Sequence, residues 1–158
     1  MTETSRMREA ISRQKLLSTL KEPYIEFLVD SGTERTLAAD EPLFRLGDPA
    51  AHFYLLYSGT VILEVPAIQG PNLVIQKLGA EQVLGWSWLI PPYQWSFQAR
   101  AGEDAEYIEF DGQRVRERCE QDPDFGYAIL LRFASLMSER LEAARMEMMR
   151  QWNPPGFA

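Results

Sequence analysis

The chain has 158 residues, 46% of them hydrophobic and 25% charged, which is typical of a single soluble globular domain. Its net charge of −7 argues against general binding to nucleic acid or to an anionic membrane surface. A single cysteine excludes an internal disulfide, and a polar start without any apolar run of ~20 residues predicts a cytoplasmic protein that does not enter a membrane.

Residues 1–32 are predicted to be helical. Apolar residues in "SRQKLLSTLKEPYIEFLVDSG" recur at the spacing of amphipathic helical turns. Pro23 suits the first turn of a second short helix, and Gly32 suits its C-terminal cap. The apolar positions that carry this prediction are Leu16, Leu17, Leu20, Ile25, Phe27, Leu28 and Val29.

Residues 33–110 are predicted to form strands. Gly, Pro or Asp interrupts this region every several residues, a pattern typical of short strands in a sandwich or barrel. "FYLLYSGTVILEV" predicts two strands joined as a hairpin at Ser58–Gly59, and "QGPN" predicts a second hairpin turn. "SFQARA" and "AEYIEF" are expected to be the last strands of the set.

Residues 111–152 are predicted to be helical again. "DGQRVRERCEQ" suits a short helix, and the following segment suits a long one with Asp122 or Asp124 as its N-cap. Residues 153–158, "NPPGFA", are expected to be a tail that ends the helix.

The long helix carries a second apolar pattern, which predicts a dimer interface. Its steps alternate between four and three residues, as in a heptad seam, and little chain follows Ser138 to cover it. The seam consists of Leu130, Ala134, Met137, Leu141, Ala144 and Met148, whereas Ile129, Phe133 and Leu136 lie beside it and are expected to face the β domain.

Neither histidine nor cysteine chemistry points to catalysis. His52, the only histidine, is expected at the surface at the start of a strand, with no nucleophile nearby. Zinc and non-haem iron sites need more ligands of this kind. Cys119 lies beside Arg118, which could activate the thiol, but we expect an inert cysteine packed with Val115. No catalytic residue and no metal site are predicted.

The order of these elements resembles the cyclic-nucleotide-binding domains of catabolite-activator and Fnr-type regulators, from about Leu16 to Trp152. In "LFRLGDPAAHFYLLYSGTVIL", Gly47, Tyr54 and Gly59 occupy the matching positions. "VLGW" corresponds to the strand that opens the family's phosphate-binding cassette, and "WSFQARAGEDAEYIEF" to its closing strands. The resemblance implies one domain over residues 1–158, an eight-stranded antiparallel β-roll of jelly-roll type with N-terminal helices and a long C-terminal dimerisation helix.

The same resemblance shows that the two charged ligand anchors are absent. Family members that bind cyclic AMP or GMP hold the ribose with a Glu after the cassette glycine and the phosphate with an Arg at the closing strand. These positions are Trp86, after Gly85, and Trp95 here, and Glu81 replaces a further family glycine. Losing the arginine alone should weaken binding by about ten- to several-hundred-fold. A cyclic nucleotide is therefore a candidate cofactor, but the Glu and Arg side chains that hold it in the family are absent from this sequence.

The candidate ligand pocket has two interpretations. Strand alternation places Trp95 and Phe97 inward and Arg100 outward. The aromatic side chains either plug a pocket that has lost its ligand or line a pocket for a planar or apolar ligand. The candidate residues are Gly85, Trp86, Ser87, Trp88, Trp95, Ser96 and Phe97. A short helix after Gly85 would offer free N–H groups to an anion.

The first hypothesis for function is a non-enzymatic sensory or regulatory module, a homodimer that signals through a protein partner. One alternative is a genuine cyclic AMP or cyclic GMP receptor that uses backbone amides in place of the missing Arg and Glu. Another is a sensor of haem or an apolar ligand, although His52 and Cys119, the only strong haem ligands, lie outside the cassette. A metal-dependent cupin-like enzyme lacks the necessary ligands.

Direct DNA binding is not expected. The family's transcription factors carry a helix-turn-helix after the long helix, whereas this sequence ends at Ala158. Arginines on the long helix alternate with glutamates, which is typical of a solvated charged face. These residues are Arg132, Arg140, Arg145 and Arg150, with Glu139, Glu142 and Glu147.

Overall fold

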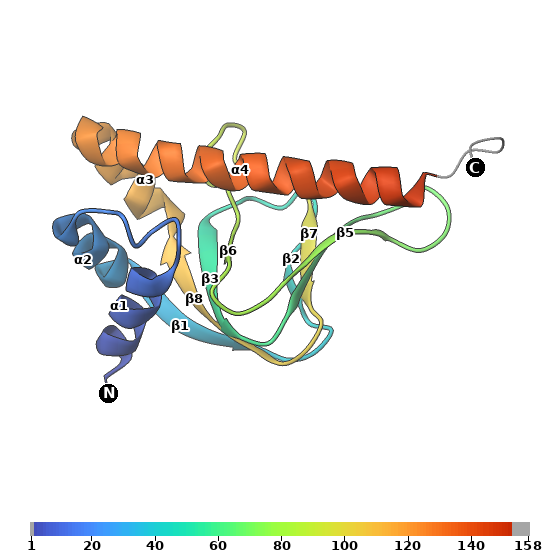
Figure 1. The fold of residues 1–158 in the computed structure, drawn as a ribbon, viewed down its shortest axis with the longest axis horizontal. Helices are drawn as coiled ribbons and strands as arrows, with labels where there is room; N and C mark the ends of the chain where they lie inside the picture. The colour runs from blue at the N-terminus through green and yellow to red at the C-terminus, as the bar shows by residue number, and fades with distance from the viewer. Residues whose placement is uncertain (1, 153–158) are drawn as a thin grey trace.

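The computed structural model describes residues 2–152, so the predicted tail lies outside the described residues. Within this range the chain forms four helices and eight strands, and the predicted fold class is confirmed. Figure 1 shows α4 running along one side of the β-roll, with α1, α2 and α3 gathered near its N-terminal end. The elements are α1 (Glu3–Arg13), α2 (Glu22–Asp30), β1 (Gly32–Leu37), β2 (Pro42–Phe44), β3 (His52–Ser58), β4 (Val61–Val65), β5 (Leu73–Leu78), β6 (Val83–Leu84), β7 (Gln98–Ala101), β8 (Ala105–Asp111), α3 (Gly112–Gln121) and α4 (Pro123–Gln151).

The strands form two four-stranded antiparallel sheets, ordered β1-β8-β3-β6 and β2-β7-β4-β5. The hairpin predicted at Ser58–Gly59 is wrong, because β3 and β4 lie in different sheets and the turn connects the two layers. Gly59 has a φ of +81°, and a Cβ there would lie 2.2 Å from the Asp104 carbonyl oxygen. The second predicted hairpin, β4 to β5 around "QGPN", is confirmed.

The first helix begins earlier than the apolar pattern predicts. In α1 the buried side chains Met7, Ala10 and Ile11 follow the i, i+3, i+4 spacing. The Thr2 hydroxyl oxygen accepts a hydrogen bond from the Ser5 N–H at 3.0 Å and caps the helix. The leucines at positions 16, 17 and 20 lie in turns after α1 instead of in a continuing helix.

Helix α2 agrees with the prediction at its start and differs at its end. Pro23 lies in the first turn, where its missing N–H costs no helical hydrogen bond. Ser31, not Gly32, is the C-cap residue. Gly32 instead begins β1 and pairs with Phe110 of β8.

Helix α4 packs one face onto the roll. The Asp122 carboxylate accepts a hydrogen bond from the Phe125 N–H at 3.3 Å, which confirms Asp122 as the N-cap. The buried side chains of this helix are Phe125, Ile129, Phe133, Leu136 and Arg140. The predicted inward orientation of the three apolar residues beside the seam is therefore confirmed, but Arg140, predicted on the solvated charged face, is only 5% exposed.

Candidate functional site

The segment after β6 forms a hydrogen-bonded turn in which the Leu89 N–H donates to the Trp86 carbonyl at 3.0 Å. The short helix predicted after Gly85 is absent from this described part of the chain. The strand predicted from "SFQARA" begins only at Gln98, so Trp95 and its neighbours lie in the connection between β6 and β7. The predicted anion site at a helix N-terminus therefore has no helix to form it.

Five of the seven predicted pocket residues line one small cavity inside the roll. Its volume is about 10 Å³, close to the minimum for a single water molecule. Ligand pockets have volumes of about 300–1,000 Å³. The lining residues are Gly85, Trp86, Ser87, Trp95 and Phe97, together with Leu63, Leu84 and Arg140. The cavity is therefore far smaller than an ordinary ligand pocket.

Aromatic packing accounts for the small size of this cavity. The Trp95 side chain is 6% exposed, and its ring stacks on Phe44 with centroids 3.7 Å apart. Trp86 and Phe97 meet edge to face at 5.7 Å. Gly85 has a φ of +101°, and a Cβ there would lie 2.9 Å from the Trp95 ring. Glycine at this position therefore allows the indole to fill the roll.

The other two predicted pocket residues, Trp88 and Ser96, lie elsewhere. Trp88 is fully buried in the core, with ring centroids 4.8 Å from Phe53 of β3 and 5.1 Å from Phe133 of α4. Its indole N–H donates to the Gly85 carbonyl at 3.0 Å. Ser96 is exposed at the surface. Trp88 thus packs between β3 and α4 in the core.

Arg100 of β7 faces away from the cavity, as the strand alternation predicts. Its guanidinium lies 3.1 Å from the Glu64 carboxylate and 3.3 Å from that of Asp40. Ala99 and Ala101, the alternate residues, are buried. Arg100 already has two carboxylate partners on the outer face and does not reach the ligand cavity.

Arg140 lies on the buried side of α4, although its charged neighbours predict the solvated face. It donates a hydrogen bond to the Val83 carbonyl of β6, while its buried Nε has no partner within residues 2–152. Burial lowers the pKa of this guanidinium from its ordinary value. The missed signal is spacing, since Arg140 follows the buried residues Phe133 and Leu136 by seven and four positions.

His52 and Cys119 both lie outside the cavity. His52 begins β3 at the surface, with Nε2 3.7 Å from the Glu109 carboxylate. Cys119 is half-buried, and burial raises the pKa of its thiol to about 11. A thiol with a raised pKa forms few thiolates at neutral pH, and the low reactivity of Cys119 stays a prediction. Among residues 2–152, no group of three or more His, Cys, Asp or Glu side chains could hold a metal ion.

The predicted seam of α4 faces away from the roll. Leu130, Leu141 and Met148 are 51%, 71% and 63% exposed, Ala134 is exposed, and Met137 and Ala144 are half-buried. Figure 1 shows the C-terminal half of the helix running over the side of the roll that holds β7 and β5. In the described range, none of the helices has the length and apolarity to cross a membrane.

Comparison with known proteins agrees with this architecture. The family model for the cyclic nucleotide-binding domain matches residues 34–122. A cyclic nucleotide-binding domain from Methylobacillus flagellatus KT superposes with a TM-score of 0.78, 17% identity and coverage of 98% of this chain and 86% of that chain. The sensor domain of the transcriptional regulator DNR from Pseudomonas aeruginosa superposes with a TM-score of 0.71 and 17% identity, and the match covers 99% of this chain and 100% of that chain. Thermus thermophilus catabolite activator protein superposes with a TM-score of 0.68 and 23% identity, and the match covers 84% of this chain and 61% of that chain. No curated protein matches the sequence significantly.

Proposed function

This chain belongs to the cyclic nucleotide-binding domain family, and on that basis we propose that it is a non-enzymatic regulatory module whose roll holds aromatic side chains in place of a cyclic nucleotide. The observation that carries this proposal is the cavity of about 10 Å³ between Trp86, Trp95 and Phe97. A ligand could enter only if these side chains moved, and that movement would break the stacking of Trp95 on Phe44.

The charge of the cavity supports the same conclusion. A phosphate moved from water into an apolar site needs hydrogen bonds or a counter-charge to offset its desolvation. Trp86 and Trp95 carry no charge, and Arg100 is held by carboxylates on the outer face. Arg140 is the cation among the lining residues, and its guanidinium already donates a hydrogen bond to the Val83 carbonyl.

We further propose that the module is a homodimer formed through α4 and that it signals through a protein partner. A heptad seam of exposed apolar residues is stable in water when a second helix covers it. The seam includes Leu130, Leu141 and Met148, each more than half exposed. With the roll filled by aromatic residues, we expect a protein contact, instead of a bound nucleotide, to carry the signal.

The ligand part of the proposal is tested by isothermal titration of the purified protein with cyclic AMP and cyclic GMP. We expect no heat at millimolar nucleotide. A micromolar Kd for either nucleotide would overturn the proposal in favour of a receptor that uses backbone amides. The absorbance spectrum of the same sample tests the haem alternative, since a Soret band would favour it.

The dimer part is tested by measuring molar mass with light scattering. The wild-type chain should give twice its mass of 18.1 kDa, and Leu141→Glu should give the single mass, because a charge in the seam opposes helix pairing. Met146→Glu is the matched control. Met146 is also exposed, at 59%, and the 3.6-residue turn places it on the opposite side of the helix from the seam. A monomeric wild type, or equal dissociation of both variants, would contradict the interface.

A further inference from the structure

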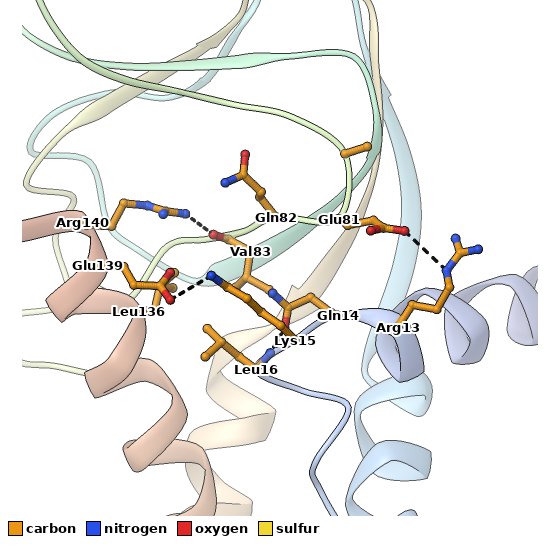
Figure 2. A pocket seen from close by; sticks show the side chains of 11 residues that line it. Arg13, Gln14, Lys15, Leu16, Glu81, Gln82, Val83, Leu136, Glu139 and Arg140 are labelled. Carbon is orange, nitrogen blue, oxygen red and sulfur yellow. Dashed lines mark hydrogen bonds and ion pairs between the residues drawn. The ribbon is translucent and has the colours of Figure 1, made fainter. Parts of the chain in front are cut away.

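A second pocket lies outside the roll, between the end of α1, the turn that connects β5 to β6, and α4. Its volume is about 280 Å³, far larger than the cavity inside the roll. Figure 2 shows the side chains of Lys15 and Arg140 both reaching toward Val83 from opposite sides of this pocket. Its lining residues are Arg13, Gln14, Lys15, Leu16, Ala80, Glu81, Gln82, Val83, Leu136, Glu139 and Arg140.

The pocket carries more positive than negative charge. Three cations line it against two carboxylates. Arg13 Nε lies 3.5 Å from the Glu81 carboxylate, and Lys15 Nζ lies 3.0 Å from that of Glu139. Arg140 donates to the Val83 carbonyl, a neutral group. Two cations are therefore paired with carboxylates at the rim. The third, the buried Arg140, makes no ion pair in the described part of the chain, and Glu139 is the carboxylate that acts on its charge.

Several hydrogen-bond donors in the pocket have no acceptor within residues 2–152. The Nε of Arg140 is buried without a partner, although a buried N–H is nearly always paired. Gln14 is 3% exposed, and its Oε1 accepts the Leu16 and Leu17 N–H groups at 2.7 and 2.9 Å. These two bonds fix the orientation of the Gln14 amide and leave its Nε2 group as a donor. Lys15 has three N–H donors, and the Glu139 carboxylate is its one ion-pair partner in this part of the chain.

We propose that this outer pocket binds the phosphate group of a small molecule or free phosphate. Its oxygens would accept hydrogen bonds from Arg140, Gln14 and Lys15, and its charge would compensate the buried guanidinium. Charge-assisted bonds from guanidinium and ammonium groups to phosphate are among the strongest in proteins. A phosphate competes with Glu139 for the Lys15 ammonium, so Glu139 opposes binding.

The outer pocket is distinct from the nucleotide position of the roll. Strand β6 (Val83–Leu84) separates the two, because Val83 lines the outer pocket and Leu84 lines the inner cavity. Arg140 is the residue common to both linings. The proposal therefore does not depend on whether the roll binds a nucleotide.

The test is isothermal titration of the full chain with inorganic phosphate at constant ionic strength in chloride buffer. We expect saturable binding with one site per chain. Lys15→Met should weaken the Kd at least about ten-fold, the effect of one lost charge-assisted bond. Lys77→Met, which removes an exposed lysine of β5 outside the pocket, is the matched control and should leave the Kd unchanged.

A substitution of opposite sign makes the test specific. Glu139→Gln should tighten phosphate binding several-fold, because it frees Lys15 and removes a repelling carboxylate. Glu142→Gln makes the same charge change on α4 outside the pocket, where Glu142 pairs with Arg145, and should leave the Kd unchanged. Arg140→Gln should abolish binding, and if this variant fails to fold, the variants at positions 15 and 139 carry the test.

A parallel titration with glycerol 3-phosphate distinguishes the two sources of the ligand. Tighter binding than inorganic phosphate supports a phosphorylated metabolite, and equal binding supports free phosphate. The absence of phosphate binding by the wild type, or an equal loss in the Lys15 and Lys77 variants, overturns the proposal.

Discussion

Replacing Trp95 with alanine tests whether an indole fills the roll. The side chain is 6% exposed, and burying an aromatic ring removes roughly 150–250 Å² from water, which at ~25 cal/mol per Å² stabilises the fold by about 4–6 kcal/mol. Its stacking on Phe44 adds about 1 kcal/mol. Trp86 and Phe97 can relax partly into the space, so we expect a net loss of about 3–5 kcal/mol, the range seen for large aromatic truncations.

This loss is measured by urea unfolding and by thermal unfolding. For a domain of this length the loss corresponds to a decrease in Tm of roughly 10–15 °C. Added indole should restore part of the Tm of Trp95→Ala and leave the wild type unchanged, because an apolar cavity accepts an apolar guest. Ile68→Ala, at a fully exposed apolar position, should alter stability by less than about 0.5 kcal/mol. A loss below about 1.5 kcal/mol for Trp95→Ala, without stabilisation by indole, would refute this account of the roll.

Three further predictions concern a helix cap, a glycine of the inner cavity and the cysteine. Asp122→Ala should destabilise the protein by about 1 kcal/mol in urea unfolding, because the Phe125 N–H loses its cap; no change would show that another group satisfies this N–H. Gly85→Ala should lower the Tm, since its Cβ would lie 2.9 Å from the Trp95 ring in a left-handed backbone conformation, and an unchanged Tm would show that the indole can shift freely. Because burial raises the Cys119 thiol pKa to about 11, its thiolate fraction at pH 8 is about a hundred-fold below that of an exposed cysteine. A disulfide reagent at pH 8 should therefore react with it far more slowly than with free cysteine, and comparable rates would contradict this.

The order of helices and strands follows from local patterns that the sequence displays directly. Turn residues separate the strands, and Asp122 and Pro23 mark helix starts. The partner of a strand is not a local property, however. The Ser58–Gly59 turn has the chemistry of a hairpin, yet the chain crosses there from one sheet to the other. Long-range pairing with β8 and β7, which no local signal displays, decides this topology.

The candidate site shows the same limit. The concentration of aromatic residues between β6 and β7 predicted a filled or aromatic-lined pocket, and five of the seven named residues do meet there. Their sequence neighbour Trp88 turns the other way, into the core. The glutamates and arginines around Arg140 predict the solvated face, whereas its spacing from Phe133 places it on the buried face. At this position the charge pattern and the helical spacing disagree, and the structure follows the spacing.

The inner cavity and the outer pocket meet at Arg140. Its side chain contributes to the walls of both. Any molecule that draws this group toward one side alters the wall of the other, and linkage requires the two effects to be equal in free energy and reciprocal. Leu141, the next residue along α4, is exposed in the helix seam. The inner cavity, the outer pocket and the helix seam therefore meet at two adjacent residues of α4, Arg140 and Leu141.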